Sequence, residues 1–353
     1  MNLSKENIVE WLEGVWKENK AKGILAQIRF KDELKRGALS HFSRKYFRGC
    51  WILSPKREDF YRTRFCFFIH GKIISCDELE NVVEPEEILG EAEGFKFKMI
   101  AGFLINAGFS VIYSLYTENG EWILLSYNAD NEVFKKIDGD LFFKKWRSKG
   151  KGRPSRGKKW SEQLKREFIK LDRETLLELY LNEKFYTSYL KEKLRIPVSD
   201  PYDVDGFIVS PQSGTIIPFE IKEKFPAEER GMKFFGIDAG RILMLLRLCL
   251  PNDSNAFYII REVDNTPKRN FRAWKFIPLS EIIMVASWNL QRGGKGMGGQ
   301  ETQTIRLPYA LFKKLSADTL SDRYLKNIGK LPANVKEIAR QFKIFITEEF
   351  FNS

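Results

Sequence analysis

The pattern of hydrophobic and polar positions predicts a chain built of both helices and strands. Near the N-terminus, apolar residues recur at helical spacing from Ile8 to Trp16, and Ser4 is a suitable N-cap for this helix. The segments 50–53 and 64–74 are rich in residues typical of strands, so we expect strands there.

A second helix is expected at 95–106, and the segment after it has the pattern of a β-hairpin. In residues 108–128, two runs of strand-forming residues flank the pair Asn119-Gly120. This pair favours a two-residue turn of type I′, in which both residues have positive φ.

The second half of the chain follows the order helix, strands, helix, strand. Residues 161–194 have a charged helical pattern, and residues 203–222 contain two strands with a turn between them. A helix at 238–250 is apolar around most of its circumference and should be buried, and strands are expected at 256–263 and 274–277. This order predicts an α/β fold with a mixed central sheet flanked by helices.

The length of 353 residues and one abrupt change in composition predict two domains. The change falls at residues 144–159, where nine of sixteen residues are Lys or Arg, none is acidic, and Gly and Pro interrupt the run. We therefore expect an N-terminal α+β domain at 1–143, a basic linker at 144–160 and a C-terminal α/β domain at 161–353.

The net charge and the small numbers of histidines and cysteines narrow the classes of function. A formal charge of +12 suits a polyanionic partner such as nucleic acid or an anionic membrane. With four cysteines in no C-x-x-C pair and two histidines, neither a structural zinc site nor a Ser-His-Asp or Cys-His set is supported. The sequence shows no signal peptide and no apolar run of the roughly 18 residues that span a bilayer, which predicts a soluble cytoplasmic protein without a membrane partner.

Three charged residues fall in the strand–turn–strand segment 202–224. In its second strand, the apolar residues Ile217, Phe219 and Ile221 are expected to point into the core. Glu220 and Lys222 are expected to point together to the opposite face. Asp205 lies in the first strand, and the turn-forming residues between the strands bring it next to Glu220.

Two carboxylates placed in this way are suited to bind Mg²⁺, because they leave coordination sites open to water and to a phosphate oxygen. The metal would lower the pKa of its water and neutralise charge on the phosphate, and Lys222 would orient or activate the attacking water. Asp205 and Glu220 are therefore the predicted metal ligands. Asp203 is an alternative for the first acidic residue. Asp205 is favoured over it, because Asp205 precedes Gly206 and lies well inside the strand.

This order of Asp205, Glu220 and Lys222 resembles the motif of the PD-(D/E)xK superfamily of restriction-endonuclease-like nucleases. Val204 stands where the motif has proline, a loosely kept position in the superfamily. The resemblance covers roughly residues 180–265. It implies a restriction-endonuclease-like core in the C-terminal domain, Mg²⁺ as cofactor with Mn²⁺ as a substitute, and products with 5′-phosphate and 3′-hydroxyl ends.

Many members of this superfamily add an acidic residue from a helix before the first strand. The resemblance therefore implies a catalytic role for Glu183, with Glu178 and Glu192 as rivals and a solvated helix face as the alternative. Beyond the lysine, Asp238 is interpreted as a helix cap, and Arg241 as either a phosphate contact or a structural residue.

The basic linker is the predicted contact to the nucleic-acid backbone. Its residues 151–157 resemble an AT-hook around a Gly-Arg-Pro core, although a flexible basic linker on the phosphates is the favoured interpretation. The glycine-rich segment 291–304 lacks the Walker A pattern and is interpreted as a surface loop. The predicted DNA-binding residues are Lys149, Lys151, Arg153, Arg156, Lys158 and Lys159.

Together these features predict a Mg²⁺-dependent endonuclease that hydrolyses phosphodiester bonds of double-stranded DNA. The N-terminal domain, assigned to recognition or regulation, and the basic linker favour a type II restriction endonuclease that acts as a homodimer in a prokaryotic cell. A defence, repair or recombination nuclease, structure-specific or activated by a ligand, is the alternative enzyme. An RNA substrate, or a DNA-binding protein that keeps this fold without cleaving, is also left open by the sequence.

Overall fold

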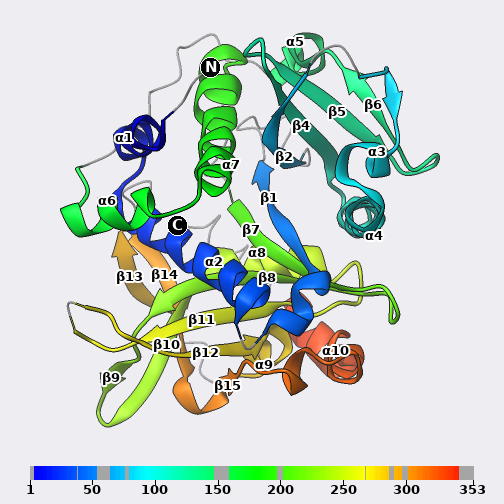
Figure 1. Ribbon diagram of the computed structural model, residues 1–353. Coiled ribbons are helices and arrows are strands. Elements are labelled where there is room, and N and C mark those ends of the chain that lie inside the picture. Colours follow the sequence, from blue (N-terminus) through cyan, green and yellow to red (C-terminus); the bar gives the residue numbers. More distant parts are fainter. Residues whose placement is uncertain are drawn as a thin grey trace. The chain divides into compact units, whose positions relative to one another are not determined.

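The computed structural model describes residues 4–37, 39–53, 64–75, 79–146, 159–196, 202–266, 268–285, 290–295 and 301–341. Within these ranges the chain forms both helices and strands, as Figure 1 shows, and the predicted mixed α/β class is confirmed. Among the described residues, no helix is both long and apolar enough to cross a lipid bilayer.

The chain forms two compact units, each built from two separate stretches of sequence. The first comprises Met1–Leu25 and Cys50–Asp203, and the second comprises Ala26–Gly49 and Val204–Ser353. The chain passes between them inside three regular elements, α2 (Glu18–Arg36), β1 (Tyr46–Leu53) and β7 (Tyr202–Ser210).

This division differs from the expected one, which placed domains at 1–143 and 161–353 with a basic linker at 144–160 between them. The change in composition does not mark a passage between units, because the helices that follow it belong to the first unit. A change in composition can indicate a boundary between consecutive segments, but it cannot reveal a unit assembled from two distant segments.

The first unit combines a mixed sheet with helices. Its helices are α1 (Lys5–Val15), α3 (Pro85–Leu89), α4 (Glu91–Asn106), α5 (Gly139–Phe142), α6 (Glu162–Ile169) and α7 (Arg173–Lys184), which continues into the π-helical segment η4 (Phe185–Lys193). Its strands are the end of β1, β2 (Phe65–Ile74), β3 (Val82–Val83), β4 (Ser110–Thr117), β5 (Trp122–Asn128) and β6 (Val133–Ile137). They lie in the order β1-β2-β4-β5-β6-β3, in which β2 and β4 are parallel.

Two consecutive phenylalanines of β2 explain why helices cover both faces of this sheet. Phe68 packs against Phe97 of α4 with ring centroids 5.3 Å apart, and Phe67 packs against Phe185 of η4 at 5.2 Å. All four side chains are almost completely buried. Because successive side chains of a strand point to opposite faces, a run of apolar residues binds one helix on each side.

The predicted N-terminal helix is confirmed as α1, in which Ile8 and Leu12 are buried. Ser4 caps it as expected, since its side chain accepts a hydrogen bond from Asn7 N. The helical pattern of residues 161–194 is also confirmed, with an interruption before Asp172, which caps α7.

The predicted hairpin is confirmed as β4 and β5, but the prediction of a two-residue type I′ turn is wrong. Thr117 N donates to Glu121 O at 2.9 Å, which closes a loop of three residues. Gly120 has a φ of +83°, whereas Asn119 is not in the left-handed region. Hydrogen bonds between Thr117 Oγ1 and the backbone of Glu121 fix this longer loop, which has its left-handed glycine at the third position.

The second unit contains part of the large sheet, including the beginning of β1, together with a smaller antiparallel sheet and several helices. Its helices are the C-terminal part of α2, α8 (Ala239–Cys249), α9 (Leu279–Met284) and α10 (Asp322–Ile328). This part of the larger sheet has the order β15-β12-β11-β8-β7-β1, which includes β8 (Thr215–Lys224), β11 (Phe257–Val263), β12 (Phe271–Pro278) and β15 (Lys313–Lys314). The smaller has the order β13-β14-β10-β9, from β9 (Ala227–Glu229), β10 (Met232–Asp238), β13 (Leu290–Lys295) and β14 (Glu301–Pro308).

The core of the second unit lies between α2 and one face of the larger sheet. Phe30 of α2 packs against Phe219 of β8 and Trp274 of β12, with ring centroids 5.5 and 5.0 Å apart. Ile217 and Ile221, on the same face of β8 as Phe219, are also buried in this cluster. The expected orientation of these three residues into the core is confirmed, which leaves Glu220 and Lys222 on the opposite face.

Gly206 permits a close approach at the start of the β7–β8 pair. It lies opposite Phe219 in the register, and a Cβ atom at Gly206 would be 2.4 Å from Phe219 Cζ and 3.0 Å from the carbonyl oxygen of Phe47. A side chain at this position would require the ring of Phe219 to move and would crowd the carbonyl oxygen of Phe47, and Asp205 precedes this point directly. The glycine therefore helps to set the position of Asp205.

Candidate metal centre

The β7–β8 hairpin brings two of the predicted site residues together. Asp203 and Asp205 come from β7 and Glu220 from β8, and one carboxylate oxygen of each lies within 4.8 Å of the others. Asp203 is the last residue assigned to the first unit, but it belongs to the same strand as Asp205. Both candidates for the first acidic residue therefore lie at the same strand pair, and their roles stay predictions.

Asp205 is held by hydrogen bonds from two elements. Gln27 Nε2 of α2 donates to Asp205 Oδ1 at 2.6 Å, and the backbone N–H of Ile221 donates to Oδ2. Each carboxylate oxygen therefore has a donor, which favours one orientation of the group.

Glu220 has an unusual environment for an acidic residue. Its side chain is fully buried, yet neither carboxylate oxygen accepts a hydrogen bond from the described residues. Lys222 Nζ and Arg241 Nε lie 2.6 and 3.2 Å from its Oε1 atom. These distances make ion pairs, but the directions of the N–H groups do not satisfy the geometry of a hydrogen bond.

A buried carboxylate without hydrogen bonds is unfavourable, because water no longer solvates its oxygens. The two nearby cations compensate part of its charge, both from the side of Oε1. Coordination of a cation is one of the few ways to satisfy the remaining capacity of such a group.

Lys222 combines proximity to Glu220 with access to solvent. Its side chain is 38% exposed, although its Nζ atom is in ion-pair contact with a fully buried carboxylate. An ammonium group in this position can donate to a ligand that approaches from solvent while it stays beside the acidic residues. Arg241, on α8, is only 15% exposed and pairs with the same Oε1 atom of Glu220.

Lys224 and Tyr258 border the site and share one acceptor, the carbonyl oxygen of Gly236. Lys224 Nζ and the Tyr258 hydroxyl donate to it at 2.5 and 2.9 Å. Burial lowers the pKa of the Lys224 ammonium, and the negative charge of Asp238 opposes this only in part. Burial raises the pKa of the Tyr258 hydroxyl well above its ordinary value, and the charge of Glu220 adds to the effect, so Tyr258 stays a neutral donor.

Asp238 is located at the N-cap position of α8, as the interpretation from the sequence had it, but its side chain makes no capping hydrogen bond. Instead its Oδ1 atom accepts a hydrogen bond from Thr304 Oγ1 of β14 at 3.3 Å. Asp238 therefore connects α8 with the smaller sheet rather than capping the helix.

Glu183 belongs to the first unit and has a partner there. Its side chain is 3% exposed, and Lys20 Nζ lies 2.6 Å from its Oε2 atom. Of its rivals, Glu178 is half-buried and Glu192 is exposed. The buried ion pair gives Glu183 a structural role within the first unit, and its predicted catalytic role stays a prediction.

The predicted DNA-binding residues Lys149, Lys151, Arg153, Arg156 and Lys158 lie outside the described residues. Lys159 is described and is exposed next to Trp160, which is buried. The glycine-rich segment forms β13 and β14 at its two ends, and its residues 296–300 are outside the described ranges.

Three residues of the site were not predicted as such from the sequence, namely Gln27, Lys224 and Tyr258. Tyr258 lies directly beside Glu220, because β11 runs parallel to β8 and the two residues are paired in the register. The recurrence of Ala26, Phe30 and Leu34 at helical spacing was the available signal for the helix that carries Gln27.

No family model, curated protein or solved structure matches this chain in comparisons with known proteins.

Proposed function

We propose that this chain is a divalent-metal-dependent nuclease that hydrolyses phosphodiester bonds of DNA. The observation that carries the proposal is the carboxylate of Glu220, fully buried and without hydrogen bonds among the described residues, beside Asp205 and Lys222. Acidic groups that only stabilise a fold are normally satisfied by hydrogen bonds, as Asp205 is, so this group needs another explanation.

The donor set suits Mg²⁺, with Mn²⁺ as a substitute. Asp205, Glu220 and Asp203 offer hard carboxylate oxygens, and the described part of the cluster contains no Cys or His ligand that would favour zinc. A bound divalent cation would neutralise charge on a phosphate and lower the pKa of a coordinated water. Asp205 and Glu220 are the proposed ligands, and Asp203 is within reach as a third.

The roles of the other residues follow from their positions. Gln27 and the Ile221 N–H hold the carboxylate of Asp205 in one orientation. Lys222, partly exposed beside Glu220, is placed to hold the attacking water or to stabilise negative charge that develops on the phosphate. Arg241 holds Glu220 from the side of α8.

The connectivity around the site supports a restriction-endonuclease-like core. Helix α2 covers one face of the sheet, β7 and β8 form an antiparallel pair with the acidic residues, and α8 leads to β11, which is parallel to β8. This is the order expected from the resemblance of Asp205, Glu220 and Lys222 to the PD-(D/E)xK motif. Within that superfamily we propose a type II restriction endonuclease of a prokaryotic cytoplasm, acting on double-stranded DNA as a homodimer.

Incubation of the purified chain with plasmid DNA, in Mg²⁺ or in EDTA, tests the proposal. We expect Mg²⁺-dependent cleavage, with discrete bands if the enzyme reads a sequence and a smear or nicks if it is structure-specific or ligand-activated. Glu220→Gln and Lys222→Ala should each reduce the rate at least about 100-fold, the effect of removing one group that acts directly in catalysis.

Lys314→Ala is the matched control for the lysine, because Lys314 is exposed on β15 of the same unit. It should cleave at the wild-type rate. Full activity of Lys222→Ala would overturn the assignment of the site. Tight DNA binding without cleavage, in Mg²⁺ and in Mn²⁺, would favour a non-cleaving DNA-binding protein.

A further inference from the structure

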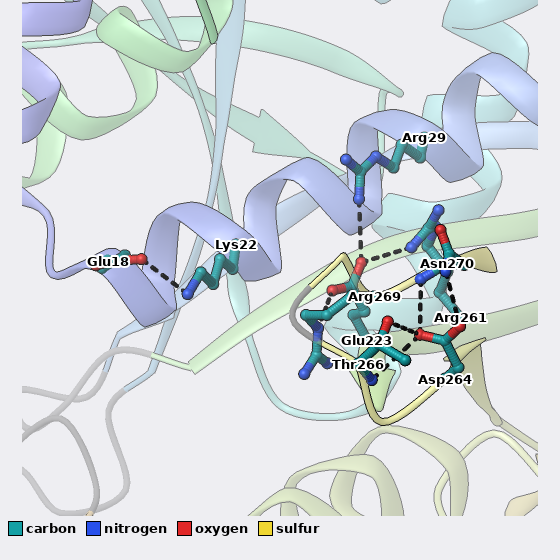
Figure 2. Close-up of polar contacts among 9 residues, drawn as sticks. All are labelled: Glu18, Lys22, Arg29, Glu223, Arg261, Asp264, Thr266, Arg269 and Asn270. Carbon is teal, nitrogen blue, oxygen red and sulfur yellow. Dashed lines mark hydrogen bonds and ion pairs between the residues drawn. The ribbon is translucent and has the colours of Figure 1, made fainter. Parts of the chain in front are cut away.

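Three arginines from different elements converge on one glutamate at the end of β8. Glu223 accepts hydrogen bonds from Arg29 of α2, Arg261 of β11 and Arg269 of the β11–β12 loop, at 3.1, 2.7 and 2.8 Å. Figure 2 shows the three guanidinium groups directed at this carboxylate from different sides. We call these four residues the arginine cluster.

The arginine cluster places three guanidinium groups around one carboxylate. Arg29 and Arg269 expose 36% and 34% of their side chains, whereas Glu223 exposes 9%. The guanidinium groups of Arg29 and Arg269 therefore lie on the solvent side of the cluster, where an anion can reach them.

The loop that carries Arg269 is held in one conformation. Arg269 has a φ of +48°, a left-handed backbone that is unfavourable for a residue with a side chain. Asp264 keeps this conformation, because it accepts hydrogen bonds from Thr266 and from Asn270 on either side of the turn. These contacts are drawn in Figure 2. Because these hydrogen bonds restrain the backbone at Arg269, binding of an anion to its side chain costs little further conformational entropy of the loop.

Aromatic rings hold two of the guanidinium groups from the other side. Arg261 lies over the ring of Phe271 at 5.0 Å, and Arg269 lies over Phe225 at 5.8 Å. Both rings are large exposed hydrophobics, at 47% and 37% exposure. A guanidinium group held between a carboxylate and a ring is a rigid fork of donors, which matches the geometry of a phosphate.

The cluster is close to the candidate metal centre along the same strand. Glu223 follows Glu220 by three residues, which corresponds to about 10 Å at the rise of a β-strand. Alternation puts Glu223 on the face of the sheet opposite Glu220, so the two sites lie on the two sides of β8 near its C-terminal end.

We propose that the arginine cluster is a seat for the DNA phosphate backbone. This inference rests on the proposed nuclease function and adds a contact surface to it. Glu223 arranges the arginines in the free protein, and phosphates bind to the exposed donors of Arg29 and Arg269. The contact carries no base information, so it contributes to affinity for all sequences alike.

The test is the salt dependence of duplex binding, measured in EDTA so that cleavage does not interfere. A labelled 20-base-pair duplex is titrated with wild type and with the double variant Arg29→Ala/Arg269→Ala between 50 and 200 mM salt. The double variant keeps Arg261 as a one-to-one partner of Glu223, which protects the fold. We expect weaker binding and a salt slope smaller by about two, close to one for each lost phosphate contact.

Two further variants separate charge from structure. Arg29→Lys/Arg269→Lys keeps both charges and should keep most of the slope. Arg323→Ala/Lys326→Ala removes two exposed cations from α10 of the same unit and should leave the slope close to wild type. Thermal unfolding of each variant checks that it is folded.

The two levels of proposal fail in different ways. An unchanged slope in a folded Arg29→Ala/Arg269→Ala variant, or an equal loss in the α10 variant, would overturn the seat even if the wild type cleaves DNA. Loss of slope in the cluster variant alone would support the seat even if no Mg²⁺-dependent cleavage is found. A wild type that binds no duplex in 50 mM salt would also overturn it.

Discussion

The side-chain amide of Gln27 donates a hydrogen bond of 2.6 Å to the carboxylate of Asp205, across 178 residues of sequence. The contact connects α2, which packs on one face of the sheet, with the acidic group at the beginning of β7. The backbone N–H of Ile221 binds Asp205 Oδ2, and Gln27 binds Oδ1. Gln27 therefore fixes the orientation of the carboxylate about its bond to the chain.

Replacement of Gln27 should therefore weaken the metal site without removing a ligand. We expect Gln27→Ala to bind Mn²⁺ about 10- to 100-fold more weakly and to cleave more slowly, as is usual when a residue that orients a ligand is lost. Saturating Mn²⁺ should restore part of the activity. Gln212→Ala, in the exposed turn between β7 and β8, is the control and should match wild type in both measurements. A purely structural role would change the unfolding temperature but not the metal affinity.

Divalent cations should stabilise the fold through Glu220. At about one hundred times the dissociation constant, Mg²⁺ that binds only the native state adds about 2.7 kcal/mol, visible as a higher melting temperature. Glu220→Gln should abolish this increase. Glu262→Gln replaces another buried glutamate, which binds Tyr309 and lies outside the acidic cluster, and should retain it. An equal increase in both variants would place the bound cation elsewhere.

Gly206 should tolerate no side chain. Its added Cβ would lie 2.4 Å from Phe219 Cζ, so Gly206→Ala should lower the free energy of unfolding by about 1–3 kcal/mol, the usual effect of overpacking. Urea denaturation measures this change. Gly23→Ala is the matched control, because no atom lies within 4 Å of its added Cβ and it is inside α2, where alanine should add about 0.5–1 kcal/mol. Similar changes in the two variants would contradict the close approach at Gly206.

The conformation of the β11–β12 loop should depend on the charge of Asp264. Hydrogen bonds from Thr266, and then from Asn270, lower the pKa of this carboxyl to about 2. The ordinary value in an unfolded chain is about 3.9, so the ionised group stabilises the loop fully above that pH. The stabilisation is lost as the pH falls from about 3.9 towards 2, where the native carboxyl takes up its proton.

An NMR titration of the Asp264 carboxyl gives this pKa directly. Thr266→Val removes the hydroxyl donor and should move the midpoint back towards its ordinary value, whereas Thr319→Val, on another loop of the same unit, should leave it unchanged. A midpoint near 4 in the wild type would show that Asp264 does not hold the loop.

The strand pair of the site could be predicted from the sequence, because the residues that determine it are neighbours along the chain. The alternation of Ile217, Phe219 and Ile221 determines the direction of Glu220 and Lys222, and the turn residues determine that β7 folds back on β8. The contact of Arg241 with Glu220 was one of two alternatives that the sequence left open.

Other features depend on packing between distant segments. Gln27 reaches Asp205 only because α2 lies on the sheet, and the arginine cluster collects residues from three elements around Glu223. The length of the β4–β5 loop was decided by Thr117, whose side chain binds the backbone across the turn. The turn propensity of Asn119-Gly120 gives no information about these hydrogen bonds of Thr117, which favour the longer loop.

The division of the second unit into residues 26–49 and 204–353 has a consequence for synthesis on the ribosome. Phe30 and Leu34 leave the ribosome well before β7 and β8, which begin about 155 residues after the first segment ends. At a rate of roughly 5–20 residues per second, the side chains of Phe30 and Leu34 have no partner strands to pack against for on the order of ten to thirty seconds. The last residue of the first unit, Asp203, is made only at the end of that interval, and the β7–β8 pair that carries the acidic residues follows directly after it.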